Sequence, residues 1–354
     1  MSATTPSLLV IYTGGTLGMV ESESGLVPGP DFEGRLRRTL QALPADRRDA
    51  LPDFTWMQTE PAIDSSAATP ADWQRLGHLI AAHYSAYQGV LILHGTDTLA
   101  WTASSLAYQL QGIHCPVIIS GAMAPLEREG SDALGNIEAA MHFAIRPDLA
   151  EVALCFNGQL LRGVRSRKWQ TQQADAFTSP NHPPLGAFID NQAVIYSGRG
   201  LTDHQRGAPR FELPDYGSLS AGGVPRIALW PGISAWQLEA WLLDERVQGA
   251  LLEVWGGGNV PEDPAILGVL AQASGEGKLL AAISQCPQGG ISLGHYAAGQ
   301  GLVDAGVMSG DDMTPEAAVT KLVHLLAQPL DDAERRRRFL TPLVGERSAP
   351  LVEM

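Results

Sequence analysis

The sequence predicts an α/β protein built from two parallel-sheet domains. Short apolar runs alternate with segments of helical periodicity along most of the 354 residues, and this alternation is typical of parallel strands joined by helices. A chain of this length favours two domains over one. The pattern fails between about Ile189 and Val224, where Gly, Pro, Asp and Arg accumulate, and then restarts. We therefore expect a larger N-terminal domain over residues 1–190, a linker over 191–224 and a smaller C-terminal domain over 225–354.

Strands of the N-terminal domain are expected where short apolar runs stop at glycine or polar residues. These runs are residues 8–12, 54–58, 90–93, 117–120 and 151–156. Helices are expected where apolar side chains recur at helical spacing, over residues 35–43, from 69 up to Gly89, over 99–110 and over 131–145. Thr69-Pro70-Ala71-Asp72 is typical of a helix start, with a threonine cap, a first-turn proline and an acid. The Gly-, Pro- and Glu-rich segment from Val20 to Phe32 is expected to be an exposed, mobile loop.

The C-terminal domain repeats the same alternation. Strands are expected over residues 227–230, 250–255 and 279–284. Ser234 caps a helix that carries apolar residues, and a last long helix runs from Thr314-Pro315-Glu316 to about Leu326. The basic run from Arg335 to Arg338 is interpreted as one solvated helix face.

Composition and charge exclude several classes of protein. Charged residues are 18% of the chain, below the usual share of about a quarter, which argues against disorder. The net charge of −14 argues against nucleic acid and anionic membrane surfaces as partners. The first seven residues lack the basic start of a signal peptide, and no stretch reaches the ~18 apolar residues of a membrane span. Cys115, Cys155 and Cys286 have no metal-ligand spacing and are expected to be small buried hydrophobes in a cytoplasmic protein.

Polar side chains follow several of the predicted strands. Thr16 comes after the first strand and the Gly14-Gly15 pair, Asp64-Ser65-Ser66 after the second, Thr96-Asp97 after the third and Gly121-Ala122-Met123 after the fourth. Because ligands bind outside the carboxyl ends of parallel strands, we expect these groups to converge in one crevice. From the first motif alone, an ordinary strand-to-loop turn is an equally good interpretation.

A hydroxyl nucleophile needs a base, and the candidates are few. His94 adjoins an apolar run and is interpreted as a packed strand residue. Lys168, Lys278 and Lys321 are the only lysines. Lys168 lies among arginines that would lower its pKa, although its spacing alone favours an exposed loop. The fingerprints of nucleotide-binding, serine-hydrolase and zinc-protease sites are missing, so we expect no cofactor and no metal.

These residues, taken in order, identify a family resemblance. The chain resembles the asparaginase/glutaminase family, and within it the cytoplasmic type I L-asparaginases of bacterial kind, from about Leu8 to Gln328. The motifs that carry the resemblance are Tyr12-Thr13-Gly14-Gly15-Thr16-Leu17-Gly18, Asp64-Ser65-Ser66, His94-Gly95-Thr96-Asp97-Thr98, Arg162-Gly163-Val164-Arg165-Ser166-Arg167-Lys168, Trp230-Pro231-Gly232-Ile233-Ser234, Gly256-Gly257-Gly258-Asn259 and Asp312-Met313-Thr314. The resemblance implies hydrolysis of L-asparagine to L-aspartate and ammonia.

The resemblance also implies roles for individual residues. Thr16 matches the family's nucleophile, which forms a β-aspartyl ester. Thr96, Asp97 and Lys168 match its second threonine, aspartate and lysine, of which the lysine and threonine transfer protons. The implied substrate-binding residues are Asp64, Ser65, Ser66, Gly95, Thr96, Asp97 and Ala122. A homo-oligomer, dimer or tetramer, is implied as well, with Tyr296 matching a tyrosine that reaches a neighbouring subunit's site.

Three positions depart from the family pattern. Leu26 stands where bacterial members often carry a tyrosine that activates or shields the nucleophile. Glu253 stands where allosteric members carry an arginine that binds effector asparagine, and Arg167 replaces a small threonine nearby. The resemblance therefore predicts that the allosteric pocket is altered or lost, with Arg167 able to neutralise Glu253.

Two alternatives to a selective asparaginase stay open. One is an asparaginase-glutaminase of relaxed specificity, because a single methylene of pocket volume discriminates by only ~1–3 kcal/mol. The other is a catalytically quiet amino-acid-binding protein on the same fold, which Leu26 makes conceivable and the intact Thr16, Thr96, Asp97 and Lys168 argue against.

Overall fold

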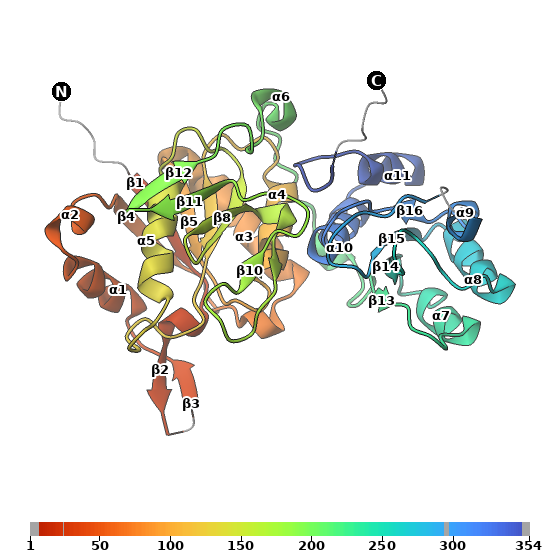
Figure 1. Ribbon diagram of the computed structural model, residues 1–354, viewed down its shortest axis with the longest axis horizontal. Helices are drawn as coiled ribbons and strands as arrows, with labels where there is room; N and C mark the ends of the chain where they lie inside the picture. The colour runs from red at the N-terminus through yellow and green to blue at the C-terminus, as the bar shows by residue number, and fades with distance from the viewer. Residues whose placement is uncertain (1–6, 24, 294–296, 349–354) are drawn as a thin grey trace. The chain divides into compact units, whose positions relative to one another are not determined.

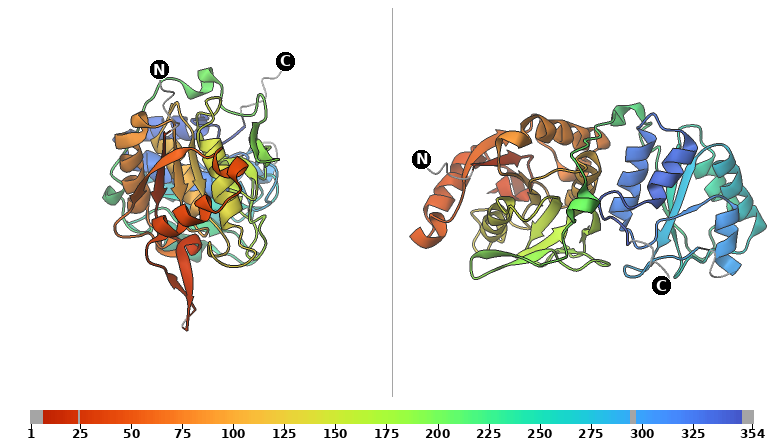
Figure 2. Two further views of the ribbon diagram at one scale, coloured as in Figure 1. Left: turned by 90° about the vertical axis from the view of Figure 1, so that its left-hand side faces the viewer. Right: turned by 90° about the horizontal axis from the view of Figure 1, so that it is seen from above.

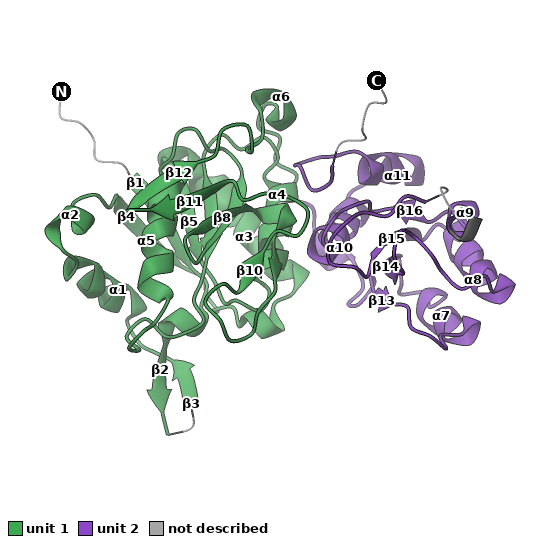
Figure 3. Cartoon of the chain, in the orientation of Figure 1, with its two compact units in different colours: residues 1–213 green, residues 214–354 purple. Residues whose placement is uncertain are grey.

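The computed structural model describes residues 7–23, 25–293 and 297–348, and the chain forms two compact units, residues 1–213 and 214–354 (Figure 3). Both units are α/β structures with parallel strands, as the sequence predicts. Among the described residues, no helix is both long enough and apolar enough to cross a membrane.

The first unit is organised around an eight-stranded sheet with the strand order β12-β11-β8-β7-β6-β5-β1-β4 (Figure 1). Its parallel strands are β1 (Ser7–Tyr12), β4 (Asp53–Gln58), β5 (Gly89–Leu93), β6 (Val117–Ser120) and β7 (Val152–Phe156). From β7 onward the sheet is antiparallel, through β8 (Gln159–Arg162), β11 (Gly186–Ile189) and β12 (Gln192–Ile195). The sheet is therefore mixed, because short turns after Phe156 and Ile189 leave no room for a crossover helix.

Helices cover the two faces of this sheet (Figure 2). The longer helices of the unit are α1 (Phe32–Gln41), α3 (Pro70–His83), α4 (Leu99–Gln109) and α5 (Ala133–Ala144), and the short helices α2 (Ala45–Arg48) and α6 (Asp203–Arg206) bury no side chain. Leu8, Val10 and Tyr12 face one core, which α1 and α5 complete with Leu36, Leu40 and Ile137 among others. Thr69 and Asp72 form the expected capping box at the start of α3. The central strands are buried throughout, which explains why their sequences are continuous apolar runs.

Two segments that the sequence presented as irregular have structure of their own. The expected loop from Val20 to Phe32 contains an antiparallel hairpin, β2 (Met19–Ser22) and β3 (Gly25–Pro28), which projects from the body of the unit (Figures 1 and 2). The expected linker over residues 191–224 begins with β12, an edge strand of the large sheet, and the first unit extends to Leu213. All three strands are short and partly exposed, so none of them leaves a long apolar run in the sequence.

The second unit has a four-stranded sheet with the order β13-β14-β15-β16, all parallel. Its strands are β13 (Arg226–Ala228), β14 (Gly249–Val254), β15 (Leu279–Ser284) and β16 (Met308–Ser309). Its helices are α7 (Ala235–Leu242), α8 (Pro264–Gly275), α9 (Ala297–Asp304), α10 (Pro315–Leu326) and α11 (Asp332–Leu340). Cys115 and Cys155 are buried as expected, but Cys286, just after β15, is exposed.

The second unit also contains a fully buried ion pair. Lys321 on α10 bonds to the Glu346 carboxylate and donates to the carbonyls of Phe339 and Thr341 at 2.8 Å each. Glu346 in turn accepts the backbone N–H groups of Leu343 and Val344. The pair thus fastens the segment after α11 to α10.

Replacing Lys321 by methionine is expected to lower the free energy of unfolding by about 3–5 kcal/mol, because Glu346 would stay buried without a counter-charge. Urea unfolding followed by circular dichroism measures the loss. The double variant Lys321→Met/Glu346→Gln removes the unpaired charge and should recover at least half of it. A single variant as stable as the wild type would contradict this account.

Candidate active site

The carboxyl ends of the central strands lie level with one another. In the parallel register Tyr12 pairs with Gln58 on one side and with Leu93 on the other, and Leu93 pairs with Ser120. The segments that follow these strands therefore emerge at one edge of the sheet. They carry the polar motifs that the sequence predicts to converge: Thr16, Asp64-Ser65-Ser66, Thr96-Asp97 and Gly121-Ala122-Met123. The chain leaves β1 toward β4 on one side and returns to β5 on the other, so this edge includes the switch point where open α/β sheets bind ligands.

Glycines bring three of these segments into contact. A Cβ added to Gly15, which has a φ of +102°, would lie 2.6 Å from the Cα of Gly95. A Cβ on Gly14 would lie 2.9 Å from the Ile63 carbonyl oxygen, and one on Gly95 would lie 2.3 Å from Ser65 Oγ. Only glycine permits such approaches. Thr16 and Thr96, which directly follow the two touching glycines Gly15 and Gly95, are thereby placed at the same point of the sheet edge.

Thr16 is the first residue of a single 3₁₀ turn, η1 (Thr16–Gly18), and is half-buried. Hydrogen bonds from Gly18 N to Gly15 O and from Met19 N to the Thr16 carbonyl close the turn. Ahead of it, Thr13 is buried and donates through both its N–H and its hydroxyl to the Leu93 carbonyl. Thr16 is therefore held on a short, internally bonded loop.

Lys168 forms a hydrogen-bonded triad with two residues that lie about seventy positions earlier in the chain. Its Nζ donates to Thr96 Oγ1 at 2.9 Å and pairs with Asp97 Oδ1 at 2.7 Å. Lys168 lies on β9 (Arg167–Lys168), which pairs with β10 (Phe177–Thr178), so the expectation of an exposed loop based on spacing alone is wrong. Thr96 is buried, whereas 59% of the Asp97 side chain is exposed and accessible to a ligand.

The Asp64-Ser65-Ser66 motif forms a capped 3₁₀ turn beside this triad. Asp64 Oδ1 accepts the N–H and the hydroxyl of Ser66 at 2.9 Å each. Thr98 Oγ1 donates to the Ser65 carbonyl at 2.8 Å, which ties this turn to the segment that carries Thr96 and Asp97. Ser65 is buried, and Asp64 and Ser66 are exposed.

The loop that carries Ala122 is held by two residues that the sequence analysis did not single out. The Asp132 carboxylate accepts the N–H groups of Met123 and Ala124 at 2.9–3.1 Å. Asn136, buried on α5, donates to the Gly121 carbonyl at 3.0 Å. Nothing in their spacing marks these residues, because they act from the start of a helix onto a preceding loop.

His94 is a buried, neutral residue of the sheet edge, consistent with its interpretation as a packed strand residue. Its Nδ1 donates to the Gly95 carbonyl at 2.7 Å, and its Nε2 accepts from the Thr102 hydroxyl at 3.2 Å. A carbonyl only accepts, which fixes the proton on Nδ1. Burial lowers the pKa of His94 below its ordinary value of 6.5, and the bond to Gly95 opposes this only in part.

The lowered pKa of His94 predicts a loss of stability in acid. In the unfolded chain His94 takes up a proton as the pH falls below about 6.5, whereas the folded protein resists protonation, so unfolding is favoured there. The contribution is fully present above pH 6.5. In urea unfolding between pH 7.5 and 5, the free energy of unfolding should fall less steeply with decreasing pH for His94→Gln than for the wild type. His78→Gln, at an exposed histidine, is the control, and equal slopes in all three proteins would contradict the prediction.

The sequence also singles out Leu26, Tyr296 and Glu253. Leu26 lies on β3 opposite Glu21, exposed on the projecting hairpin. Tyr296 lies outside the described residues. In the second unit, Glu253 is buried on β14 and pairs with Arg226 Nε at 2.7 Å. No group of acidic, histidine and cysteine side chains within residues 7–23, 25–293 and 297–348 could hold a metal ion.

Comparisons with known proteins agree with this fold along most of the chain. The family model described as "Asparaginase, N-terminal" matches residues 7–199, and the "Glutaminase/Asparaginase C-terminal domain" model matches residues 223–339. The chain is 40% identical to L-asparaginase 1 of Escherichia coli K12 over 96% of its own length and 97% of that protein. The crystal structure of L-asparaginase I from Vibrio cholerae matches with a TM-score of 0.86 at 36% identity, covering 98% of this chain and all of that one. A 60 kDa lysophospholipase of Mus musculus is 34% identical, over 98% of this chain and 63% of that protein.

Proposed function

The chain belongs to the asparaginase/glutaminase family, and from that premise we propose that it is an L-asparaginase, which hydrolyses L-asparagine to L-aspartate and ammonia. The observation that carries the proposal is the Thr96–Lys168–Asp97 triad, placed by the Gly15–Gly95 contact beside the turn of Thr16. Similarity over nearly the whole of a relative named L-asparaginase 1 supports the same substrate.

In the proposed first step the Thr16 hydroxyl oxygen attacks the side-chain amide carbon of asparagine. The carbon–nitrogen bond breaks, a proton reaches the leaving nitrogen, and ammonia departs from a β-aspartyl ester on Thr16. Thr96 and Lys168 carry the proton between nucleophile and leaving group, because the 2.9 Å bond between them forms a ready path.

In the second step water attacks the ester carbon, and its proton returns to the Thr16 oxygen as aspartate leaves. The same Thr96–Lys168 pair serves this transfer in reverse. Neither step consumes an oxidant or reductant, so the residues present and water suffice for the reaction.

Substrate binding is assigned to charges and donors at the sheet edge. We propose that the exposed Asp97 carboxylate pairs with the α-ammonium group of asparagine, with Asp64 nearby. The hydroxyls of Ser65 and Ser66 and the backbone at Gly95 and Ala122 complete the pocket. Asp132 and Asn136 keep the Ala122 loop in place for this contact.

Ammonia release from L-asparagine, L-glutamine and D-asparagine, with the KM of each, tests the function. Turnover of L-asparagine with much weaker turnover of L-glutamine is the expected result. Comparable kcat/KM values for both amides would favour the relaxed asparaginase-glutaminase. Binding of asparagine in calorimetry with no ammonia release would favour the catalytically quiet binding protein.

The rate is expected to depend hyperbolically on asparagine concentration, with a Hill coefficient near one. A guanidinium binds an effector carboxylate through a bidentate fork, whereas Glu253 repels it. Within its own unit Glu253 is moreover paired with Arg226, on the neighbouring strand of the same sheet. Steady-state kinetics over a wide range of asparagine concentrations measure the Hill coefficient. A sigmoidal curve that turned hyperbolic in an Arg167→Ala variant would show a retained effector site.

We also propose a homo-oligomer, at least a dimer, since closed twofold assemblies are the default for soluble proteins and the family resemblance includes an intersubunit tyrosine. Sedimentation at assay concentration measures this state, and a fully active monomer would refute it.

A further inference from the structure

Arg35 on α1 connects three segments around the turn that carries Thr16. Its side chain is only 13% exposed. The guanidinium donates from NH2 to the Gly18 carbonyl at 2.5 Å, from Nε to the Pro30 carbonyl at 3.1 Å and from NH1 to Glu127 Oε2 at 2.8 Å. It also lies over the Phe32 ring, 5.3 Å from its centroid.

The Gly18 carbonyl is the end of the Thr16–Gly18 turn, so the first of these bonds fixes the turn itself. The same carbonyl accepts Gly29 N at 3.1 Å, which closes the base of the β2–β3 hairpin. A Cβ at Gly29 would lie 2.6 Å from Arg35 NH2, so the guanidinium fits only because that residue is glycine. One side chain thereby holds both the nucleophile's turn and the two ends of the hairpin.

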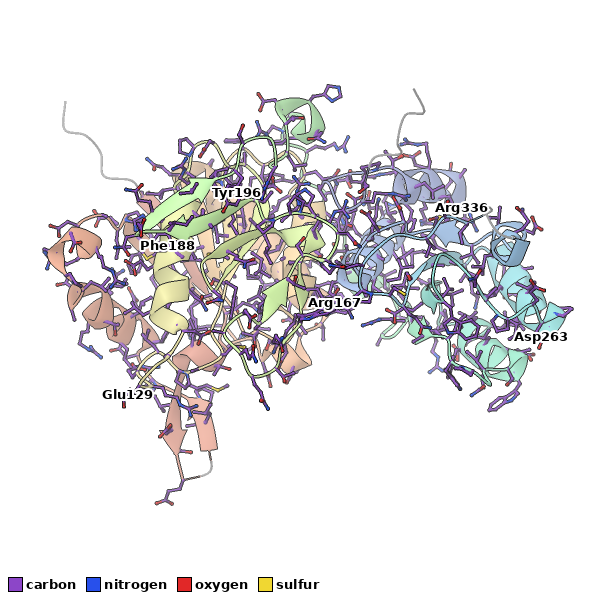
Figure 4. All side chains as sticks on the ribbon, viewed as in Figure 1. Glu129, Arg167, Phe188, Tyr196, Asp263 and Arg336 are labelled. Atoms are coloured by element: carbon purple, nitrogen blue, oxygen red, sulfur yellow. The ribbon has the colours of Figure 1, made fainter. Side chains whose placement is uncertain are left out.

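Packing holds the inner side of this region, where Leu17 is fully buried, and a pocket opens on its outer side. A cavity of about 680 Å³ separates the start of the hairpin, at Met19–Glu21, from the loop at Pro125 and Glu127–Glu129. Glu129 lies beside the base of the hairpin (Figure 4). Next to this pocket Arg35 bonds to Glu127, and Leu126 N donates to the Leu17 carbonyl at 3.1 Å, while both leucine side chains are buried in one core cluster. The middle of the turn is thus anchored by Leu17 in the core, and its end is fixed by the bond from Arg35 to the Gly18 carbonyl.

We propose that Arg35 is a positioning residue for catalysis, which holds the Thr16 turn at the attack geometry through the Gly18 carbonyl. The inference rests on the proposed function for its kinetic part. A misplaced nucleophile slows the chemical step while substrate binding, which uses other loops, is kept. Glu127 orients the guanidinium, but it is 45% exposed and contributes less.

Arg35→Met is expected to lower kcat by about 10- to 100-fold and to leave KM within about threefold, in line with the effect of an ångström-scale misplacement. Arg35→Lys keeps the charge but not the planar fork, so it should recover only part of kcat. Glu127→Gln should stay within about threefold of the wild type, because the two carbonyl bonds of Arg35 remain. The matched control is Arg38→Met on the same helix, whose side chain is 70% exposed and makes only a 3.7 Å pair with Asp31.

Hydrogen–deuterium exchange gives a readout that does not depend on activity. The peptide containing Gly18 and Gly29 should exchange faster in Arg35→Met than in the wild type or Arg38→Met, while peptides of β5 and β6 keep their protection. Faster exchange together with a kcat loss at unchanged KM supports the proposal. Unchanged exchange, or faster exchange with normal kcat, overturns it. If the wild type releases no ammonia from asparagine, the proposed function fails, and the exchange result alone decides whether Arg35 fixes the turn.

Discussion

Replacing Thr16 by alanine is expected to reduce kcat for asparagine hydrolysis by about 10⁴-fold or more, the scale seen when a nucleophile is removed from an enzyme that works through a covalent intermediate. The physical reason is that alanine lacks the attacking oxygen, and the nearby Thr96 hydroxyl is already bonded to Lys168 as the proposed proton carrier. Substrate binding should persist, because the carboxylate of Asp97 and the Asp64-Ser65-Ser66 turn are untouched. Ammonia release measures kcat, and calorimetry with L-aspartate measures binding.

Thr16→Ser is the matched control for this prediction. Serine keeps the hydroxyl and loses only a methyl group, so it should retain far more activity than alanine. Mass spectrometry of acid-quenched wild type should show an acyl adduct on the peptide that contains Thr16. An alanine variant that turned over asparagine at a near-normal rate would rule out the covalent mechanism.

Replacing Lys168 by methionine is expected to lower kcat by about 10³-fold, within the range that general acid–base groups contribute. Methionine matches the length of the lysine stem but cannot exchange protons, and it removes the charge that pairs with Asp97 at 2.7 Å. KM should not rise, because an Asp97 carboxylate freed from Lys168 still offers its charge to the substrate ammonium. Steady-state ammonia release at several asparagine concentrations separates kcat from KM.

Lys168→Arg distinguishes proton transfer from simple charge. Arginine keeps the positive charge but stays protonated at any working pH, so it cannot accept a proton from the Thr96 hydroxyl. We expect it to be nearly as impaired as the methionine variant. Recovery of most of kcat with arginine would show that Lys168 acts only electrostatically and that another group moves the proton.

The parallel cores could be predicted from the sequence, and the antiparallel additions could not. Strands such as β1 and β15 are buried on both faces and leave continuous apolar runs that end at glycine or polar residues. The hairpin β2–β3 and the edge strand β12 are partly exposed, and Gly25, Pro28 and the residues around Asp190 are typical of loops. Their strand geometry arises from pairing with neighbours, which local sequence does not encode.

The residues at the candidate site also differ in whether the sequence predicts their positions. The positions of Thr16, Thr96 and Asp97 at one sheet edge could be predicted because each follows a predicted strand, so the sheet itself orders them. Lys168 was found only through the family resemblance, since its position depends on a two-residue strand and on partners some seventy residues earlier. Arg35 was not found at all, because it acts through backbone carbonyls whose position no side-chain pattern reveals.

The contact between the glycine loops has a consequence for biosynthesis. Thr13 bonds to Leu93 across a separation of 80 residues, and Lys168 bonds to Thr96 across 72. During translation Arg35 can bond to the turn of Thr16 early, but the turn meets the Gly95 segment only after β5 has emerged and docked. The proton-transfer pair forms only after β9 and β10 have followed. Truncated or stalled chains that end before residue 168 would thus carry Thr16 without the triad, and the proposed mechanism places the onset of hydrolysis late in synthesis.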